Sequence, residues 1–300
     1  MTMFSRRQLC LKGAPALVAT GLGAPTRAQF ARIASPQAVV AALDGLATSE
    51  RLAGAVDGPV RAIALLSDPS LSALLTAVAA GCSLILSAES PFYGKPADPA
   101  AATGPFAAMA RSAIDALHDS PAFRAKQAFI ADHHLTVYRL TPRDDGAPAA
   151  EALAARLGWG AYRDRSSRAA IYRPPGLTLA QLIALAHARL GANGGLRFIG
   201  DPAMRLSSVL LAPGTAEVVR TTQALRHADA LLTGDMREWE LVEYVHDSAE
   251  AGMPKALVST GRILSEQPFL ERCGLALKQA FPTLRQHHAM RGDPFWRVQA

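Results

Sequence analysis

Several familiar signatures of catalysis are absent from this sequence of 300 residues. It has no Gly-x-Ser-x-Gly, no glycine-rich phosphate loop ending in lysine and no Cys-x-x-Cys. Without these motifs, the sequence gives no support for a serine hydrolase, a nucleotide kinase or a dithiol oxidoreductase. It also lacks a dense basic run interleaved with aromatic residues, so we expect no nucleic-acid partner.

Cysteine is scarce, with only Cys10, Cys82 and Cys273 in the chain. Cys82 lies in an apolar run typical of a buried strand, and Cys273 lies in a helical pattern. In an oxidising compartment the two could form a disulfide, but sequence does not test its geometry. We expect two buried thiols, with the disulfide as the alternative.

The N-terminus has the layout of a removable export signal. Residues 5–12 read Ser-Arg-Arg-Gln-Leu-Cys-Leu-Lys, which closely matches the twin-arginine signal, and the apolar run 13–23 follows. This run is about half the roughly 20 residues needed to span a bilayer, so we expect no membrane anchor. We predict that residues 1–28 are a twin-arginine signal peptide, and that the mature protein is periplasmic or secreted.

The predicted signal also accounts for most of the positive charge. The chain has 31 Lys and Arg against 25 Asp and Glu, which gives a net charge of +6. Residues 1–28 hold four of the basic residues and no acidic one, so the remaining chain has a net charge of +2. The high isoelectric point therefore says little about partners of the mature protein.

The apolar pattern alternates helices with short strands, which indicates the α/β class. We expect two similar α/β halves, 29–165 and 178–300. Strand 60–66, helix 71–80 and strand 82–86 form a βαβ unit, which favours a parallel sheet. The other expected strands are 127–130, 135–140, 196–199, 207–211, 230–232 and 255–259. The other expected helices are 35–52, 148–157, 178–190, 216–226 and 238–251.

Five segments together carry a family resemblance. They are LILSAESPFYG at 84–94, YRLTPRDD at 138–145, ADALLTGDMREWELVEY at 228–244, GRILSE at 261–266 and GDPFWRV at 292–298. Their order and spacing resemble the Nif-three-like family of dinuclear-metal, hexameric proteins, some labelled type 2 GTP cyclohydrolases. The resemblance spans nearly all of the mature chain. It implies the Nif-three-like fold and a homo-oligomer, such as a closed hexameric ring.

The family's metal ligands are only partly retained here. In the family, two adjacent histidines, one aspartate, and a His and a Glu four residues apart bind two metal ions. The corresponding residues are Glu89, Ser90, Asp145, Arg262 and Glu266. The resemblance leaves the carboxylates of Glu89, Asp145 and Glu266 as candidate metal ligands. Carboxylates favour Mg²⁺, Mn²⁺ or Ca²⁺ over the Zn²⁺ that imidazole prefers.

Arg262 is difficult to reconcile with a divalent ion. A guanidinium stays charged in proteins and repels a nearby metal ion. It can instead form hydrogen bonds to the remaining carboxylates and partly substitute for the metal charge. We therefore expect the two-metal site to be absent or reduced to one weakly bound ion. Thr141, which replaces a family histidine, belongs to the same expected cleft.

Three functions stay open from the sequence. The favoured one is a non-catalytic relative that binds a small anionic ligand in the cleft, with Ser90, Thr141, Arg143 and Arg262 contributing. The first alternative is a metal-dependent hydrolase of a phosphorylated or nucleotide-like small molecule. The second is a purely structural homo-oligomer. No catalytic residue and no organic cofactor site can be assigned from the sequence.

Overall fold

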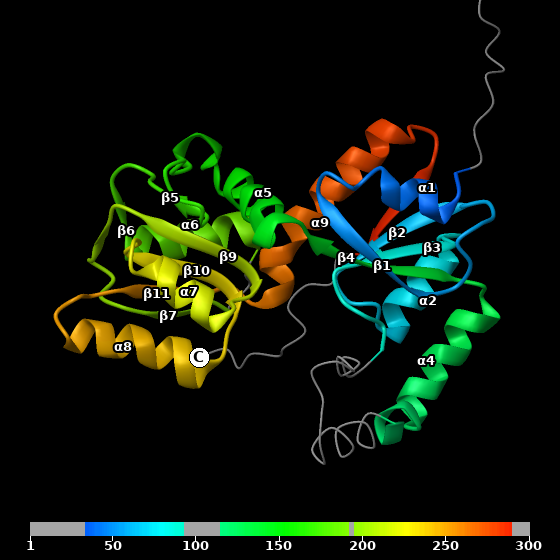
Figure 1. Ribbon diagram of the computed structural model, residues 1–300, viewed down its shortest axis with the longest axis horizontal. Helices are drawn as coiled ribbons and strands as arrows, with labels where there is room; N and C mark the ends of the chain where they lie inside the picture. The colour runs from blue at the N-terminus through cyan, green and yellow to red at the C-terminus, as the bar shows by residue number, and fades with distance from the viewer. Residues whose placement is uncertain (1–33, 93–114, 192–194, 290–300) are drawn as a thin grey trace, which may run out of the picture. The chain divides into compact units, whose positions relative to one another are not determined.

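The computed structural model describes residues 34–92, 115–191 and 195–289 (Figure 1). The predicted signal peptide and the resemblance at 292–298 lie outside these residues. The protein is of the mixed α/β class, as predicted.

The described elements, in chain order, have the following bounds. They are α1 Pro36–Ala41, β1 Ala47–Ala53, β2 Ala62–Leu66, α2 Leu71–Ala79, β3 Leu84–Ser87, α4 Pro121–Asp132, β4 Thr136–Pro142, η1 Asp144–Gly146, α5 Ala147–Leu157, η2 Gly160–Tyr162, β5 Ile171–Tyr172, β6 Leu177–Thr178, α6 Leu179–Leu190, β7 Arg197–Ile199, β8 Arg205–Leu206, β9 Val209–Thr215, α7 Val218–Leu225, β10 Ala230–Asp235, η3 Glu238–Val242, α8 Glu243–Glu250, β11 Ala256–Ser259, α9 Arg262–Ala280 and β12 Arg285–Ala289.

The first sheet has the strand order β1-β4-β3-β2-β12. Strands β4, β3, β2 and β12 are parallel, and β1 is antiparallel to β4. All five residues of β2 are buried, because the sheet has an apolar layer on both faces. Helices α2 and α4 pack on one face, and α1, α5 and α9 pack on the other.

The second sheet has the order β5-β9-β10-β11-β7. Its three central strands are parallel and its two edge strands are antiparallel to their neighbours. Helices α5 and α6 cover one face, while η3, α7 and α8 cover the other. Because α5 contributes to the cores of both sheets, it is a shared structural element of the two halves.

The predicted βαβ unit is confirmed by β2, α2 and the parallel strand β3. Two other expectations were wrong. The helix expected over 35–52 ends at Ala41, and its second part is strand β1, which pairs with β4 over a long register. The strand expected at 127–130 lies inside α4, which begins with a Ser120 cap and Pro121, a strong helix start.

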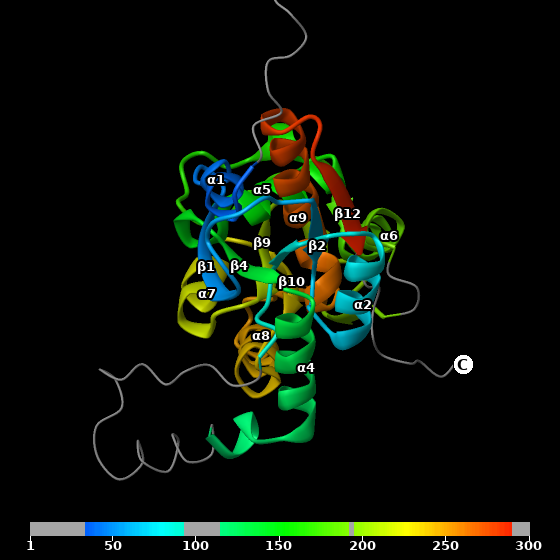
Figure 2. The same ribbon diagram turned by 90° about the vertical axis from the view of Figure 1, so that its right-hand side faces the viewer.

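The C-terminal strand β12 joins the first sheet, although it lies in the range assigned to the second half. It lies beside β2 (Figure 2) and runs parallel to it. His287 is paired with Ala64. The chain therefore crosses from the second sheet back to the first through α9, which contacts strands of both sheets.

Cys82 and Cys273 are free thiols, and both are buried. Burial raises the pKa of Cys82 and raises that of Cys273 to about 12. Both thiols are therefore protonated and poorly reactive in the folded protein at neutral pH.

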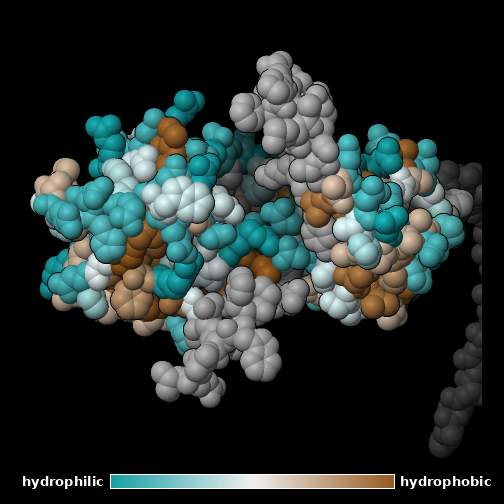
Figure 3. Space-filling model, turned by 90° about the horizontal axis from the view of Figure 1, so that it is seen from below, coloured by the Kyte–Doolittle hydropathy of each residue, from teal (hydrophilic) through white to brown (hydrophobic). Residues whose placement is uncertain are grey.

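On the face shown in Figure 3, hydrophobic residues are interspersed with hydrophilic ones. The most exposed large apolar side chains in the described part come from separate elements, such as Trp239 on η3 and Leu275 on α9. Among the residues described, no helix combines the length and apolar character needed to cross a membrane.

Candidate functional site

Arg262, the first residue of α9, lies among three carboxylates. Its Nη2 is 2.5 Å from Oδ1 of Asp68, and its Nη1 is 2.6 Å from Oε2 of Glu266. The same Nη1 is 3.8 Å from Oε1 of Glu89, which is an ion pair without a hydrogen bond. We call these four residues the Arg262 cluster. The guanidinium bridges α9 to the first sheet through charge-assisted hydrogen bonds.

The strand topology brings the acidic residues together. Asp68 follows the end of β2, and Glu89 follows the end of β3. The two strands are parallel neighbours, with Leu66 paired to Ser87, so both acidic residues lie at the same edge of the sheet. Ligand sites in open α/β sheets are typically formed at this edge.

Two glycines allow α9 to approach the second sheet. A Cβ on Gly234 would lie 2.3 Å from Oγ of Ser265 and 2.8 Å from Cα of Arg262. Gly214 has a φ of +79°, and a Cβ there would lie 2.8 Å from Oε1 of Glu266. Only glycine lets the first turn of α9 pack this closely against the ends of β9 and β10.

A buried hydrogen-bond pair fixes the same turn. Oγ of Ser265 accepts from the backbone N–H of Gly214 at 2.9 Å and donates to the carbonyl of Arg262 at 2.7 Å. Ser265 is fully buried. Its side chain therefore ties α9 to β9 directly beside Arg262 and Glu266.

Burial dominates the electrostatics of Glu266. It raises the pKa of that carboxyl to about 7, with Arg262 opposing the shift and the nearby Glu89 and Asp68 adding to it. Burial alone would lower the pKa of Arg262, but the charges of Glu266, Asp68 and Glu89 raise it overall. Arg262 is thus a permanent cation, and its positive charge is shared among three acidic groups.

The remaining predicted residues are dispersed. Asp145, in η1, forms an ion pair with Arg220 of α7 at 2.7 Å, and its side chain is 86% exposed. Asp145 has a left-handed φ of 55°. Oγ of Ser90 accepts from the N–H of Phe92, while Arg143 is exposed at the start of η1. The structure therefore joins Glu89, Glu266 and Arg262, and leaves Asp145 outside their ion pairs.

A cavity of about 840 Å³ nevertheless joins several of these positions. Glu89, Thr141, Asp145 and Glu266 all contribute to its lining. Sequence reasoning did not assign three further members of this region: Arg168 and Arg220 in the cavity lining, and Asp68 in the Arg262 cluster. The position of Asp68 just beyond a buried parallel strand was the signal for its role. The volume is that of a small-molecule site.

The comparison with protein families identifies the chain. The family described as Duf34/NIF3 (NGG1p interacting factor 3) matches residues 127–291, more than half of the sequence. The chain belongs to the Duf34/NIF3 family. The comparison with curated proteins found no match to this Duf34/NIF3 chain.

Solved structures support the same fold. A hypothetical protein of Staphylococcus aureus has a TM-score of 0.65 at 12% identity, over 88% of this chain and 99% of that chain. A Bacillus cereus protein related to NIF3 has a TM-score of 0.64 at 12% identity, over 89% and 100%. A Thermus thermophilus protein has a TM-score of 0.55 at 14% identity, over 81% and 88%. At such low identities the similarity shows the fold alone.

The Arg262 cluster does not fit the two-metal centre that the resemblance implies. The guanidinium lies where the carboxylates of Asp68, Glu89 and Glu266 converge, and it repels a divalent ion there. Within residues 34–92, 115–191 and 195–289, no group of three or more His, Cys, Asp or Glu residues could hold a metal ion. The site of this Duf34/NIF3 protein is organised around an internal cation.

Proposed function

We propose that this Duf34/NIF3 protein works without a metal ion, as a non-catalytic protein that binds a small anionic molecule in the cavity of about 840 Å³. The observation that carries the proposal is the convergence of Asp68 and Glu266 on Arg262, with Glu89 nearby. An arginine in this position offsets negative charge that a metal ion would otherwise balance. Its hydrogen bonds also hold the carboxylates in place.

Two other arginines support an anionic ligand. Arg168 is exposed and lines the cavity, and its guanidinium has no ion pair with any residue that the structure describes. Arg220 is paired with Asp145, but both side chains are more than half exposed. An exposed pair contributes little energy, so a phosphate or carboxylate group would readily displace Asp145. Arg262 is already occupied by carboxylates and has a supporting role.

Metal analysis tests the first part of the proposal. We expect the mature protein, purified without chelator, to contain far less than one Mn, Mg, Ca or Zn per chain by mass spectrometry. The Arg262→Ala variant should gain melting temperature when Mn²⁺ is added, because its acidic groups lose their cation. Arg272→Ala is the matched control, since Arg272 is also an ion-paired arginine of α9 but pairs with Glu151. One ion or more per chain, lost in Glu89→Ala and Glu266→Ala, would contradict the proposal.

A ligand titration tests the second part. We expect pyrophosphate or adenosine monophosphate to raise the melting temperature of the wild type. The Arg168→Gln variant should need a ligand concentration about tenfold higher or more for the same rise. Arg165→Gln provides the control, because Arg165 is exposed on the same loop and does not line the cavity. A stabilisation equal in all three proteins would rule out Arg168 as the anion contact.

A metal-dependent hydrolase of phosphorylated or nucleotide-like molecules is the second candidate. It is favoured only by the shared cavity lining of Glu89, Asp145 and Glu266. This function predicts Mn²⁺-dependent turnover of p-nitrophenyl phosphate that disappears in Glu89→Ala. Turnover that persists in this variant, or no turnover at all, would argue against it.

Export and assembly complete the proposal. The twin-arginine sequence at residues 5–12 supports translocation to the periplasm, and the family resemblance supports a closed homo-oligomer such as a hexamer. Fractionation of cells that express Arg6→Lys, Arg7→Lys and wild-type chains tests whether the protein is exported. Light scattering on the mature protein tests whether it forms an oligomer.

A further inference from the structure

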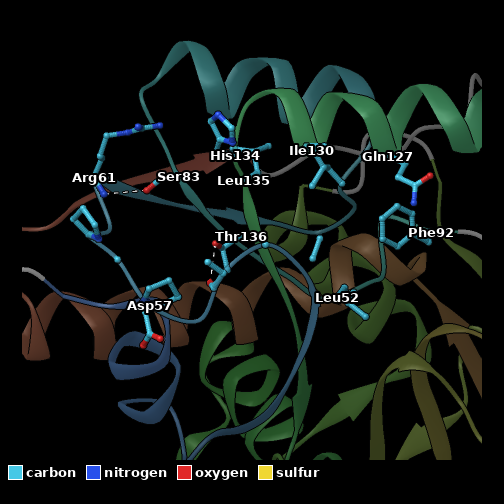
Figure 4. A pocket seen from close by; sticks show the side chains of 17 residues that line it. Leu52, Asp57, Arg61, Ser83, Phe92, Gln127, Ile130, His134, Leu135 and Thr136 are labelled. Carbon is cyan, nitrogen blue, oxygen red and sulfur yellow. Dashed lines mark hydrogen bonds between the residues drawn. The ribbon is translucent and has the colours of Figure 1, made fainter.

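A second cavity, of about 600 Å³, lies at the other edge of the first sheet (Figure 4). Its lining includes Arg61 and Ser83, which directly precede β2 and β3, and Thr136, which begins β4. The Arg262 cluster lies beyond the opposite ends of β2 and β3. The second cavity is therefore separate from the site described above, and its volume is again that of a small-molecule site.

One wall of this cavity is apolar and is held in place by close packing. Leu135 and Ile130 are buried, while Leu52 and Phe92 are half-buried in the same lining. Gly54 has a φ of +80°, and a Cβ on it would lie 2.4 Å from the carbonyl oxygen of Leu135. The loop between β1 and β2 thus packs tightly against the start of β4, so this wall is largely preformed.

The polar groups of the cavity include the guanidinium of Arg61. The backbone N–H of Arg61 donates to Oγ of Ser83 at 3.0 Å, which fixes the main chain there. Its guanidinium has no ion pair or hydrogen bond within the described part of the chain. Thr136, in contrast, is satisfied, because its Oγ1 donates to the carbonyl of Ala55 at 3.1 Å. The carboxylate of Asp57 is turned away from Arg61 (Figure 4).

The cation and the aromatic ring of this cavity lie toward different ends. Arg61 and His134 lie toward one end of the cavity, and Phe92 and Gln127 lie toward the other, with Ile130 between them (Figure 4). This separation suits an amphipathic molecule rather than a uniformly polar one. A molecule with one anionic group could place it at Arg61 and cover the apolar wall with its body.

We propose that this second cavity binds a small carboxylic acid with an apolar, aromatic or branched body. The carboxylate contacts the guanidinium of Arg61, and the body packs against Leu52, Ile130 and Phe92. The binding needs no metal ion and involves no residue of the Arg262 cluster. It therefore does not rest on the function proposed for the first cavity.

The test compares phenylacetate with its neutral analogue phenylacetamide, by chemical-shift titration of the mature protein. We expect phenylacetate to bind, and Arg61→Gln to weaken its binding about tenfold or more while changing phenylacetamide binding little. Arg124→Gln is the matched control, because Arg124 is an exposed arginine of α4 outside this cavity. It should bind phenylacetate like the wild type.

A second variant locates the bound molecule. Ala131 is exposed on α4 and lines the cavity, so Ala131→Phe should fill the space without disturbing the core and abolish binding of both probes. The proposal is overturned if neither probe binds at millimolar concentration, or if Ala131→Phe leaves phenylacetate binding intact. It is also overturned if Arg61→Gln binds phenylacetate as tightly as the wild type does.

Discussion

At the residue scale, the packing of the Arg262 cluster requires that residue 234 is a glycine, without a Cβ. We expect Gly234→Ala to lower the free energy of unfolding by about 1–3 kcal/mol, because the new Cβ would collide with Ser265 and with the backbone of Gly214 and Arg262. Urea unfolding measures this change. Gly45→Ala is the matched control: Gly45 is exposed, and a Cβ there meets nothing within 4 Å. Equal stabilities of the two variants would contradict this packing.

Glu266 gives a prediction about pH. Burial raises its pKa to about 7 from an ordinary 4.5. An acid with a raised folded-state pKa stabilises the fold below its unfolded pKa, and this contribution is lost as pH rises through about 7. We therefore expect the unfolding free energy of the wild type to fall between about pH 5 and about pH 8, relative to Glu266→Gln, by on the order of 1–3 kcal/mol.

Urea unfolding of both proteins across that range measures the difference. Only its slope with pH is diagnostic, because Glu266→Gln also weakens the hydrogen bond to Arg262. Parallel pH profiles would show that Glu266 is ionised in the folded protein throughout, as an ion pair with Arg262 alone would require.

The sequence predicted part of this cluster and missed the rest for a physical reason. A family resemblance pointed to Glu89, Arg262 and Glu266, and the structure brings these three together. It also pointed to Asp145, which instead pairs with Arg220. It did not point to Asp68, which binds Arg262, while Ser70 caps α2. Contacts between residues 194 positions apart depend on tertiary packing, which local patterns do not encode.

At the scale of elements, one buried hydroxyl links α9 to β9 by a hydrogen bond. We expect Ser265→Ala to lower the free energy of unfolding by about 1–3 kcal/mol, because it leaves the buried N–H of Gly214 without its acceptor. Denaturant unfolding measures the loss. Ser49→Ala, at an exposed position of β1, should change stability by less than about 0.5 kcal/mol. A Ser265→Ala variant as stable as this control would show that water or another group takes over the hydrogen bond.

Local patterns identified most elements but not their boundaries or all partners. The βαβ unit was predictable because its Ser-Asp-Pro-Ser turn and apolar runs agree with the fold. The strand at 127–130 was wrong because its apolar residues form the buried face of α4, where Ile130 packs on the first sheet. Strand β12 was not predicted at all. Its sequence, Arg-Gln-His-His-Ala, is polar, and pairing with β2 determines its conformation.

At the scale of the whole molecule, the two sheets are joined by shared elements rather than by a linker. Helix α5 contributes to the apolar cores of both sheets, and α9 contacts strands of both. The Arg262 cluster adds charged contacts between α9 and the loops after β2 and β3. The described residues from 34 onward belong to one compact unit. This arrangement predicts that the two sheets unfold together.

The two buried thiols can test whether both faces of the first sheet and the shared helix α9 open as one unit. Cys82 packs with α2 and α4 against the first sheet, and Cys273 lies on α9 between elements of the first core. We expect iodoacetamide to reach both thiols only when the protein unfolds globally. In a Cys10→Ser chain, the alkylation rates of the two thiols should therefore give opening free energies that agree within about 1 kcal/mol. Mass spectrometry of peptides at several low urea concentrations measures both rates at once. Gly274, the neighbour of Cys273 on α9, packs against His288 and Gln286 of β12, so early detachment of β12 would expose the Cys273 side of the first core. A much faster reaction at either thiol would therefore show that part of the first core opens before the rest. It would also show that the shared helices do not make the molecule a single cooperative unit.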